Sequence, residues 1–325
     1  SGTPEISRAQ SVNSIDEIVV TARKKDESLQ DVPVAVSALG EEALNQLGVD
    51  TFEDYLTQLP GVTAGGSGPG QNTIYIRGLA STTPNQTTAG VAGLAPNVSF
   101  YLDEQPLAQP GRNLDVYAAD IQRIEVLSGP QGTLFGQNST GGAINVISKK
   151  PSTEERTVKT QLTMGNFNMM KLSSSSNTPI SDTIATRLAV SVVNRDGFSK
   201  NVTNGQYLDD ADNVSIRSDW IFDINESTSL RIFGQYFNTD RNGAAMKGID
   251  DPTLGARSLS QDTLSNQELT SSVYAAIYES DLGFANLKIL ASKQKDDILV
   301  DRDNDRHNFG DPVLSIPGLI GTTYI

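Results

Sequence analysis

The sequence contains no cysteine and only one histidine, His307. Without thiols, disulfides and cysteine-ligated zinc sites are excluded. A Ser-His-Asp triad would have to use His307, which stands in a polar run. We therefore predict no catalytic centre, no cofactor and no metal site.

Long hydrophobic runs are also missing. Apolar residues make up 37% of the 325 residues without forming a long stretch, which excludes a helical membrane protein. Membrane-crossing β-strands are not excluded, because their apolar residues alternate with polar ones. The net charge is −14, and neither residues 1–150 nor residues 151–325 offer a basic face, so we expect no nucleic-acid partner.

Ile121–Pro151, IQRIEVLSGPQGTLFGQNSTGGAINVISKKP, is the most informative stretch. Its two ends alternate in the manner of strands, and five glycines between positions 129 and 142 predict a tightly turning backbone between them. A phosphate-binding loop would need a lysine after Gly136 and a helix after Gly142. The sequence has neither, so nucleotide binding is not favoured.

The region before this stretch predicts alternating short strands and helices. Pro33 marks an edge strand or a strand start, and Pro60-Gly61 ends a helix. The expected elements are strands at Gln30–Leu39, Ile74–Gly78 and Val98–Leu102 and helices at Gly40–Leu47 and Thr51–Leu59. Residues 30–151 are therefore predicted to form a mixed α/β unit.

After Pro151 the pattern changes to long strands with period-two alternation, clearest in Ser215–Ile224. The strands are about ten residues long, as membrane-crossing strands are, and the links between them alternate between short and mostly long. We expect strands at 157–164, 168–177, 183–194, 214–224, 228–238, 271–279 and 284–297.

Several runs resemble the plug domain of TonB-dependent outer-membrane receptors. They are LPGV at Leu59–Val62, IYIRG at Ile74–Gly78, SFYLDEQP at Ser99–Pro106 and IEVLSGPQGTLFG from Ile124. The sequence departs from the usual wording at Ser128, where the family has arginine, and at Asp103-Glu104, where it has DG. The resemblance rests on specific sequence motifs in residues 15–151 and only on the pattern of strands in residues 152–325.

The resemblance implies a periplasmic N-terminal segment (1–29), a plug domain (30–151) and the first part of an antiparallel transmembrane β-barrel (152–325), incomplete in this chain. It implies active transport across the outer membrane, most often of a ferric siderophore, with oligosaccharides, aromatic compounds and cobalamin as alternatives. The implied partners are a TonB-type energy-coupling protein, a small extracellular ligand and outer-membrane lipid. An enzyme and a cell-surface adhesin are the competing classes.

The resemblance also assigns roles to residues. The TonB box, which binds its partner by strand addition, would consist of Asp16, Glu17, Ile18, Val19, Val20, Thr21 and Ala22. By composition alone the same run is an ordinary edge strand.

Two long polar excursions between core strands, 64–72 and 79–97, are expected to reach the ligand. The candidate ligand-binding residues are Ser67, Gln71, Asn72, Asn85, Gln86, Gln109 and Arg112. Arg77, Arg123 and Glu125 are either solvated charges or ion-pairing groups between plug and barrel.

Two expectations concern the end of the chain. Asp301, Asp303 and Asp305 resemble the start of a calcium-binding loop, but Arg306 and Pro312 break the motif, so we expect them to be solvated. Seven strands form an odd number, and a barrel around such a plug needs on the order of 22 strands. We therefore expect a polypeptide more than twice this length, with a C-terminal aromatic residue.

Overall fold

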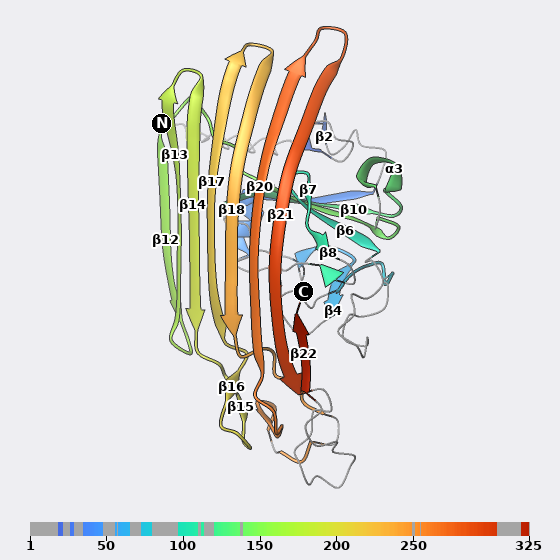
Figure 1. Cartoon of the computed structure of the whole chain (residues 1–325), viewed down its shortest axis with the longest axis vertical. Coiled ribbons are helices and arrows are strands. Elements are labelled where there is room, and N and C mark those ends of the chain that lie inside the picture. Colours follow the sequence, from blue (N-terminus) through green and yellow to red (C-terminus); the bar gives the residue numbers. More distant parts are fainter. Residues whose placement is uncertain are drawn as a thin grey trace, which may run out of the picture.

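The protein consists of a small N-terminal unit, the plug, and one large curved sheet, the barrel sheet (Figure 1). This computed structural model describes residues 19–21, 27–28, 35–47, 56, 58–65, 73–79, 97–109, 112–113, 120–136, 139–248, 251–253, 255–303 and 320–324. Among these residues, no helix is sufficiently long and apolar to cross a membrane.

The plug is built on a five-stranded sheet in the order β3-β10-β11-β6-β7. Its strands are β3 (Val36–Gly40), β10 (Ile121–Ser128), β11 (Gly142–Ser148), β6 (Val98–Leu102) and β7 (Gln105–Pro106). Every residue of β11 and β6 is buried, which explains why these runs are mostly apolar instead of alternating. The strand predicted at 98–102 and the two strands predicted at the ends of the Ile121–Pro151 stretch are thereby confirmed.

Two helices of the plug lie at the ends of these strands. The predicted first helix is confirmed as α1 (Glu41–Gln46), whose first turn carries two glutamates that suit the helix dipole. The glycine-rich turn contains a four-residue helix, α3 (Gly132–Phe135), where we expected only a tight turn. Most of the expected helix at 51–59 lies outside the described residues.

Short strand pairs complete this part of the chain. They are β1 (Val19–Val20) with β2 (Glu27–Ser28), β4 (Val62–Gly65) with β5 (Thr73–Ile76), and β8 (Ala108–Gln109) with β9 (Arg112–Asn113). The strand expected to reach Gly78 ends at Ile76, because Arg77 and Gly78 both have positive φ, 53° and 77°.

The barrel sheet is antiparallel, and its eight strands follow the order β12-β13-β14-β17-β18-β20-β21-β22. Their bounds are Thr157–Gly165, Met169–Ser181, Ile184–Arg195, Ala211–Asn225, Thr228–Arg241, Asn266–Asp281, Asn286–Asp303 and Ile320–Tyr324. The first seven are the seven predicted strands. The sheet is open, with β12 and β22 at its edges, and most of its long connections lie at the lower end in Figure 1.

Several strands are longer than predicted. Strands β17, β18, β20 and β21 contain 15, 14, 16 and 18 residues, whereas about ten suffice to cross a bilayer. They extend into segments expected to be loops. The remaining connections form a small sheet of β16 (Tyr207–Leu208), β15 (Ser199–Asn201) and β19 (Ser258–Leu259), which joins two loops that are distant in sequence.

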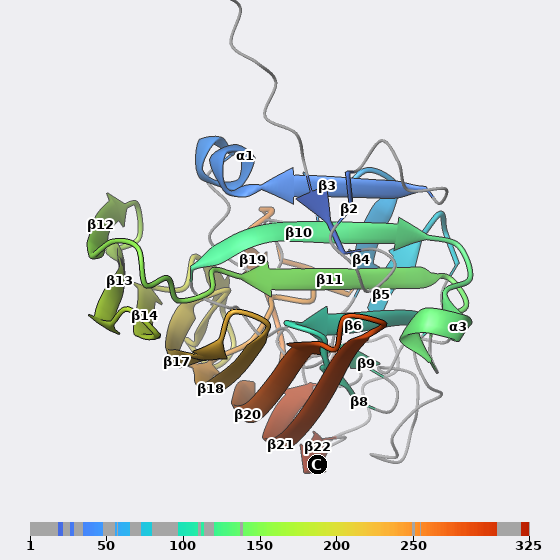
Figure 2. The same ribbon diagram turned by 90° about the horizontal axis from the view of Figure 1, so that it is seen from above.

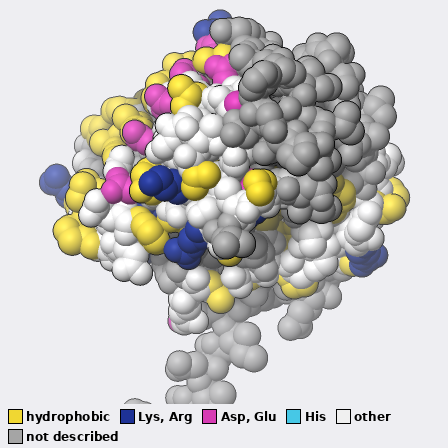
Figure 3. Space-filling model, turned by 90° about the horizontal axis from the view of Figure 1, so that it is seen from below, with side chains coloured by type: hydrophobic (Ala, Val, Ile, Leu, Met, Phe, Trp, Pro, Cys, Tyr) yellow, Lys and Arg dark blue, Asp and Glu magenta, His cyan; other side chains and the backbone are white. Residues whose placement is uncertain are grey.

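The two faces of the barrel sheet differ. Viewed from above, the strands curve around the plug, which lies on their concave side (Figure 2). The convex side exposes apolar residues, which gather along one side of the molecule in Figure 3. Among them are Leu188, Ile216, Trp220, Ile232, Tyr236, Tyr274 and Ile289. This is the alternation that strands in contact with lipid require.

The pairing of β10 with β11 depends on Gly142. This residue has φ of +144°, and an added Cβ would come within 2.2 Å of the Leu127 carbonyl oxygen and 2.8 Å of Ile76 Cδ1. We expect Gly142→Ala to destabilise the plug by more than about 2 kcal/mol, measured by protease sensitivity in increasing urea. Gly132→Ala, where no atom lies within 4 Å, is the control and should be near neutral. Equal resistance of the two variants would contradict this account.

Candidate functional site

The most deeply buried charges lie between the plug and the barrel sheet. Asp103 and Glu104 connect β6 to β7, and both have positive φ, 47° and 69°, the combination found in type I′ hairpin turns. This turn directs the Asp103 carboxylate, whose side chain is 1% exposed, toward strands β17 and β18.

Two arginines of the barrel sheet meet this carboxylate. Asp103 Oδ2 lies 2.5 Å from Arg217 Nη2 and 3.5 Å from Arg231 Nη2. Asp219 Oδ2 accepts from both arginines as well, at 3.1 Å and 2.5 Å. The Arg217 guanidinium also lies over the Phe233 ring, 4.1 Å from its centroid. The result is a buried cluster of two carboxylates and two guanidinium groups.

The plug holds Asp103 in place from its own side. Ser148, the last residue of β11, donates from its backbone N to Oδ1 at 3.0 Å and from its hydroxyl to Oδ2 at 2.7 Å. Burial by itself raises the pKa of Asp103, but the attraction of Arg217 and Arg231 and the two Ser148 hydrogen bonds outweigh it and lower the pKa from 3.8 to about 2. Asp103 is therefore ionised at any physiological pH.

Three further ion pairs join the two parts of the chain. Asp120 pairs with Arg187 of β14, Glu104 pairs with Lys288 of β21, and Glu41 Oε1 lies 3.4 Å from Lys159 Nζ of β12. The Glu41 pairing is exposed and so contributes little. In each of these three pairs the plug supplies the carboxylate and the barrel sheet supplies the cation.

The N-terminal segment makes a second polar contact, on the plug alone. Val20 is completely buried against Tyr101, Leu127 and Phe135. The next residue, Thr21, donates from its backbone N to Glu125 Oε1 at 2.8 Å and from its hydroxyl to Oε2 at 3.1 Å. The segment is therefore anchored to β10, the second strand of the plug sheet.

The structure places the predicted charged residues as follows. Arg123 Nε lies 2.8 Å from Glu125 Oε1, so these two residues pair with each other on β10. The sequence left Glu125 open between a solvated charge and an ion pair with the barrel; its side chain is buried and points to the sheet face that carries Thr21. Arg77 is exposed, and its backbone N donates to the Gly61 carbonyl at 2.9 Å.

The other predicted site residues lie largely outside the described part of the chain. The residues outside it are Asp16, Glu17, Ile18 and Ala22 of the N-terminal segment and Ser67, Gln71, Asn72, Asn85 and Gln86 of the candidate ligand-binding set. Gln109 and Arg112 are described only by their backbones, which face each other in the β8–β9 pair. Their roles in ligand binding remain predictions.

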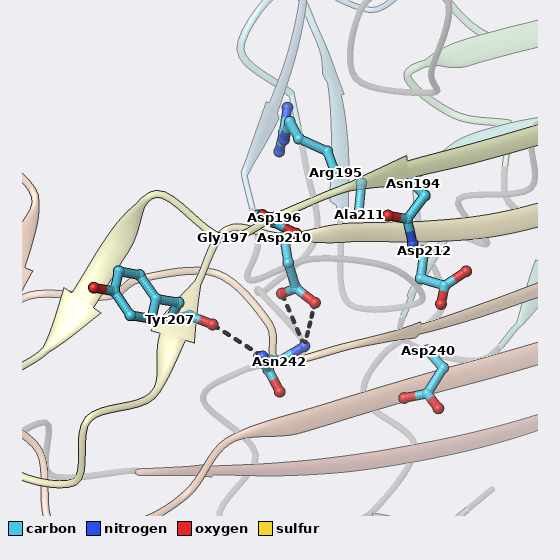
Figure 4. A pocket seen from close by; sticks show the side chains of 10 residues that line it. All are labelled: Asn194, Arg195, Asp196, Gly197, Tyr207, Asp210, Ala211, Asp212, Asp240 and Asn242. Carbon is cyan, nitrogen blue, oxygen red and sulfur yellow. Dashed lines mark hydrogen bonds between the residues drawn. The ribbon is translucent and has the colours of Figure 1, made fainter. Parts of the chain in front are cut away.

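A cavity of about 450 Å³ opens at the ends of β14, β17 and β18, beside the small sheet (Figure 4). Asp210 lies in it and accepts from the backbone N of Asn242 at 2.9 Å. Burial raises the pKa of the Asp210 carboxyl, and its hydrogen bonds only partly oppose this. The described residues that line the cavity are Asn194, Arg195, Asp196, Gly197, Tyr207, Asp210, Ala211, Asp212, Asp240 and Asn242.

Reading the sequence missed the partners of Asp103. The available signal was the set of charged residues at alternate positions on otherwise amphipathic strands, as at Arg217, Asp219 and Arg231. A charge on the concave face of a strand must find a partner, but the sequence does not say which one. Metal binding has no comparable basis in the described residues, where no group of three or more acidic or histidine side chains could hold an ion.

We expect Asp103→Asn to weaken the attachment of the plug by about 3–5 kcal/mol, because it removes the plug's charge from a buried cluster. The neighbouring Glu104→Gln removes a more exposed pair and should cost less than about 1 kcal/mol. Protease sensitivity of the plug in increasing urea measures both effects. Equal losses would show that burial of Asp103 is not what matters.

The stability difference between the unmodified protein and the Asp103→Asn variant depends on pH. The folded-state pKa of Asp103 lies below its ordinary value, so its stabilisation is present above about pH 4 and is lost as the pH falls toward 2. The Asp103→Asn variant should lack this part of the acid destabilisation.

Comparisons with known proteins agree with the arrangement of plug and barrel sheet. Residues 28–143 match the family model "TonB-dependent Receptor Plug Domain". The pesticin receptor of Yersinia pestis is 31% identical over 156 residues, 47% of this chain and 22% of that protein. The ferrichrome outer membrane transporter/phage receptor of Escherichia coli K12 is 31% identical over 137 residues, 41% of this chain and 17% of that protein.

Solved structures extend the likeness beyond the plug. The ferric yersiniabactin uptake receptor FyuA of Yersinia pestis superposes with a TM-score of 0.69 at 19% identity, over 83% of this chain and 42% of that one. At that identity the likeness concerns the fold alone. The chain matches only about a fifth of the length of the two curated relatives. Its plug, its barrel strands and these relatives show that the chain belongs to the TonB-dependent outer-membrane receptors.

Proposed function

We propose that this receptor takes up a small extracellular ligand by active transport across the outer membrane. Energy would come from a TonB-type protein that binds the segment Asp16–Ala22. The observation that carries the proposal is the attachment of Thr21 to Glu125, because it connects the segment directly to the plug sheet.

The contacts suggest how a pull on this segment would reach the barrel. Thr21 is bound to Glu125 on β10, and Asn145 on β11 donates to the Thr21 hydroxyl at 3.2 Å. Ser148, three residues further along β11, is bound to Asp103, which is bound to the arginines of β17 and β18. Force applied at Thr21 would therefore load the central strands before it reached the buried ion cluster.

The docked segment also has to be released before a partner can bind it. Val20 is completely buried, and β1 pairs with β2, so the residues that a partner strand would recognise are engaged within this chain. Strand addition requires free backbone donors and acceptors. Binding of the partner and opening of the β1–β2 pair are thus expected to be one event.

A ferric siderophore is the proposed cargo. Support comes from the ferrichrome transporter among the relatives and from the ferric yersiniabactin receptor among the solved structures. The predicted ligand residues are mostly neutral amides and hydroxyls, which offer generic hydrogen bonds and do not select one cargo.

Deleting Glu17–Ala22 tests the energy coupling. We expect uptake to fall to background while ligand binding at the cell surface is retained, because the deletion removes the attachment to Glu125 and leaves residues 23–325 unchanged. Deleting the six residues Ser7–Val12 is the matched control and should preserve uptake. Persistent uptake without Glu17–Ala22 would contradict the coupling role.

Iron limitation tests the cargo. We expect expression of the receptor to rise when iron is withheld, and cells that carry it to accumulate iron-55 from a ferric siderophore panel. Cells with the Glu17–Ala22 deletion should bind the label without accumulating it. Unchanged expression, or saturable uptake of cyanocobalamin in place of ferric siderophores, would reject an iron cargo while leaving energy-coupled transport standing.

A further inference from the structure

In the part of the chain that the structure describes, the plug contacts the barrel sheet through two different kinds of surface. On β18, β20 and β21 the contact is apolar, and these strands contribute to the same hydrophobic cluster as the plug core residues Phe100, Ile124 and Val146. The barrel residues in this cluster are Phe233, Phe237, Leu269, Val273, Ala275, Ile277, Ile298 and Val300. We call this surface the apolar seam.

On β13, β14 and β17 the corresponding surface combines polar side chains with three buried apolar residues of β14, Ala185, Ala189 and Val193. Ser173, Ser191 and Ser215 are directly opposite one another on these adjacent strands, so they form one row across the concave face. Ser191 and Ser215 are buried, with 3% and 2% of their surfaces exposed. Of the residues described, none from β12, β13, β14 or β17 belongs to the cluster of the apolar seam. We call the surface formed by these three serines and Arg187 the polar seam.

The ion pair across the polar seam is Asp120 with Arg187, in which Arg187 Nη2 donates to Asp120 Oδ1 at 2.9 Å. Both side chains retain about a tenth of their exposure, unlike those of the Asp103 cluster. The Asp103 cluster lies at the boundary between the seams, because Arg217 belongs to β17 and Arg231 to β18.

Water affects the two seams differently. Separating the polar seam returns the serine hydroxyls and both charges of the ion pair to water, which solvates them, so the net change in free energy is small. Apolar side chains gain nothing from water, and separating them exposes apolar surface on both sides. When the plug is pulled, the polar seam therefore separates first, whereas the apolar seam holds.

We propose that the ligand passes between the plug and the polar seam, while the plug stays attached to β18, β20 and β21. This inference rests on the proposed transport function and adds the location of the passage. Hydroxyl groups both donate and accept hydrogen bonds, so the row of serines suits a hydrophilic ligand with many oxygen atoms.

Thiol labelling of two matched positions tests the proposal in the complete receptor in cells. Ser191→Cys lies in the polar seam and Ala275→Cys in the apolar seam, and both are small residues with 3% and 5% of their surfaces exposed. The sequence has no cysteine of its own, so the introduced thiol is the only one in these 325 residues. A membrane-impermeant maleimide is added with a ferric siderophore that the receptor takes up, and labelling is timed.

During uptake we expect labelling of Ser191→Cys to accelerate at least about ten-fold, because a buried site reacts only when its surroundings open. Labelling of Ala275→Cys should stay unchanged. Deleting Glu17–Ala22 in the same background should remove the acceleration. Faster labelling at Ala275→Cys, at both positions or at neither overturns the proposal.

Reversible cross-linking gives a second measurement if either variant folds poorly. A cleavable bismaleimide joins Asp120→Cys to Arg187→Cys across the polar seam, or Glu104→Cys to Lys288→Cys beside the apolar seam. Both pairs replace an ion pair between plug and barrel. The first cross-link should block uptake until it is cleaved, and the second should leave uptake within about two-fold of the uncross-linked protein. The reverse pattern, or equal effects, rejects the proposal.

These experiments distinguish failure of the proposed transport function from failure of the proposed location of the passage. If the unmodified receptor accumulates no ligand in any energised assay, the transport function itself is wrong. If it accumulates ligand but the labelling and cross-linking patterns do not separate the two seams, only the location of the passage is wrong.

Discussion

The requirement that a buried carboxylate be matched by cations organises the contact between plug and barrel. Asp103 is almost inaccessible to water, so its charge would oppose folding unless Arg217 and Arg231 were close to it. Their own charges in turn require Asp219. One acidic turn residue thus determines which side chains two barrel strands must present.

The turn geometry and the ion cluster depend on each other. A left-handed conformation at both Asp103 and Glu104 is unfavourable for residues other than glycine, asparagine or aspartate, yet it aims one carboxylate at β17 and β18 and the other at Lys288 of β21. The Ser148 hydrogen bonds then fix Asp103 relative to the plug sheet. The same short turn therefore holds the plug in register with three barrel strands.

Under the proposed function, the plug has to stay in place and yet let a ligand pass it. The division of the interface into an apolar seam and a polar seam offers a physical basis for both demands, because water can replace one set of contacts far more readily than the other. The attachment of Thr21 to Glu125 adds a point at which force from outside the barrel can enter the plug. These features are local, so each can be changed without rebuilding the other.

The sequence alone determined the elements whose patterns are short-range. The glycine turn, the core strands of the plug and the first seven of the eight barrel strands follow from alternation and from positions such as Gly142, where the backbone accepts only glycine. The motifs shared with the family located the plug, because each motif is a continuous run of residues in the sequence. The extra length of β17 to β21 and the small sheet of β15, β16 and β19 escaped prediction, since pairing partners rather than local composition decide where a polar strand ends.

Tertiary structure alone decided which charges meet. Arg187, Arg217, Arg231 and Lys288 are spread over about a hundred residues and share no motif, and Asp120 and Asp103 lie well before them in the sequence. Reading the sequence left Glu125 open between solvent and the barrel, whereas the fold turned it toward Thr21, because successive residues of β10 face opposite sides of the sheet. Alternation tells which residues share a face, but only the packing of one sheet inside the curve of another tells what that face touches.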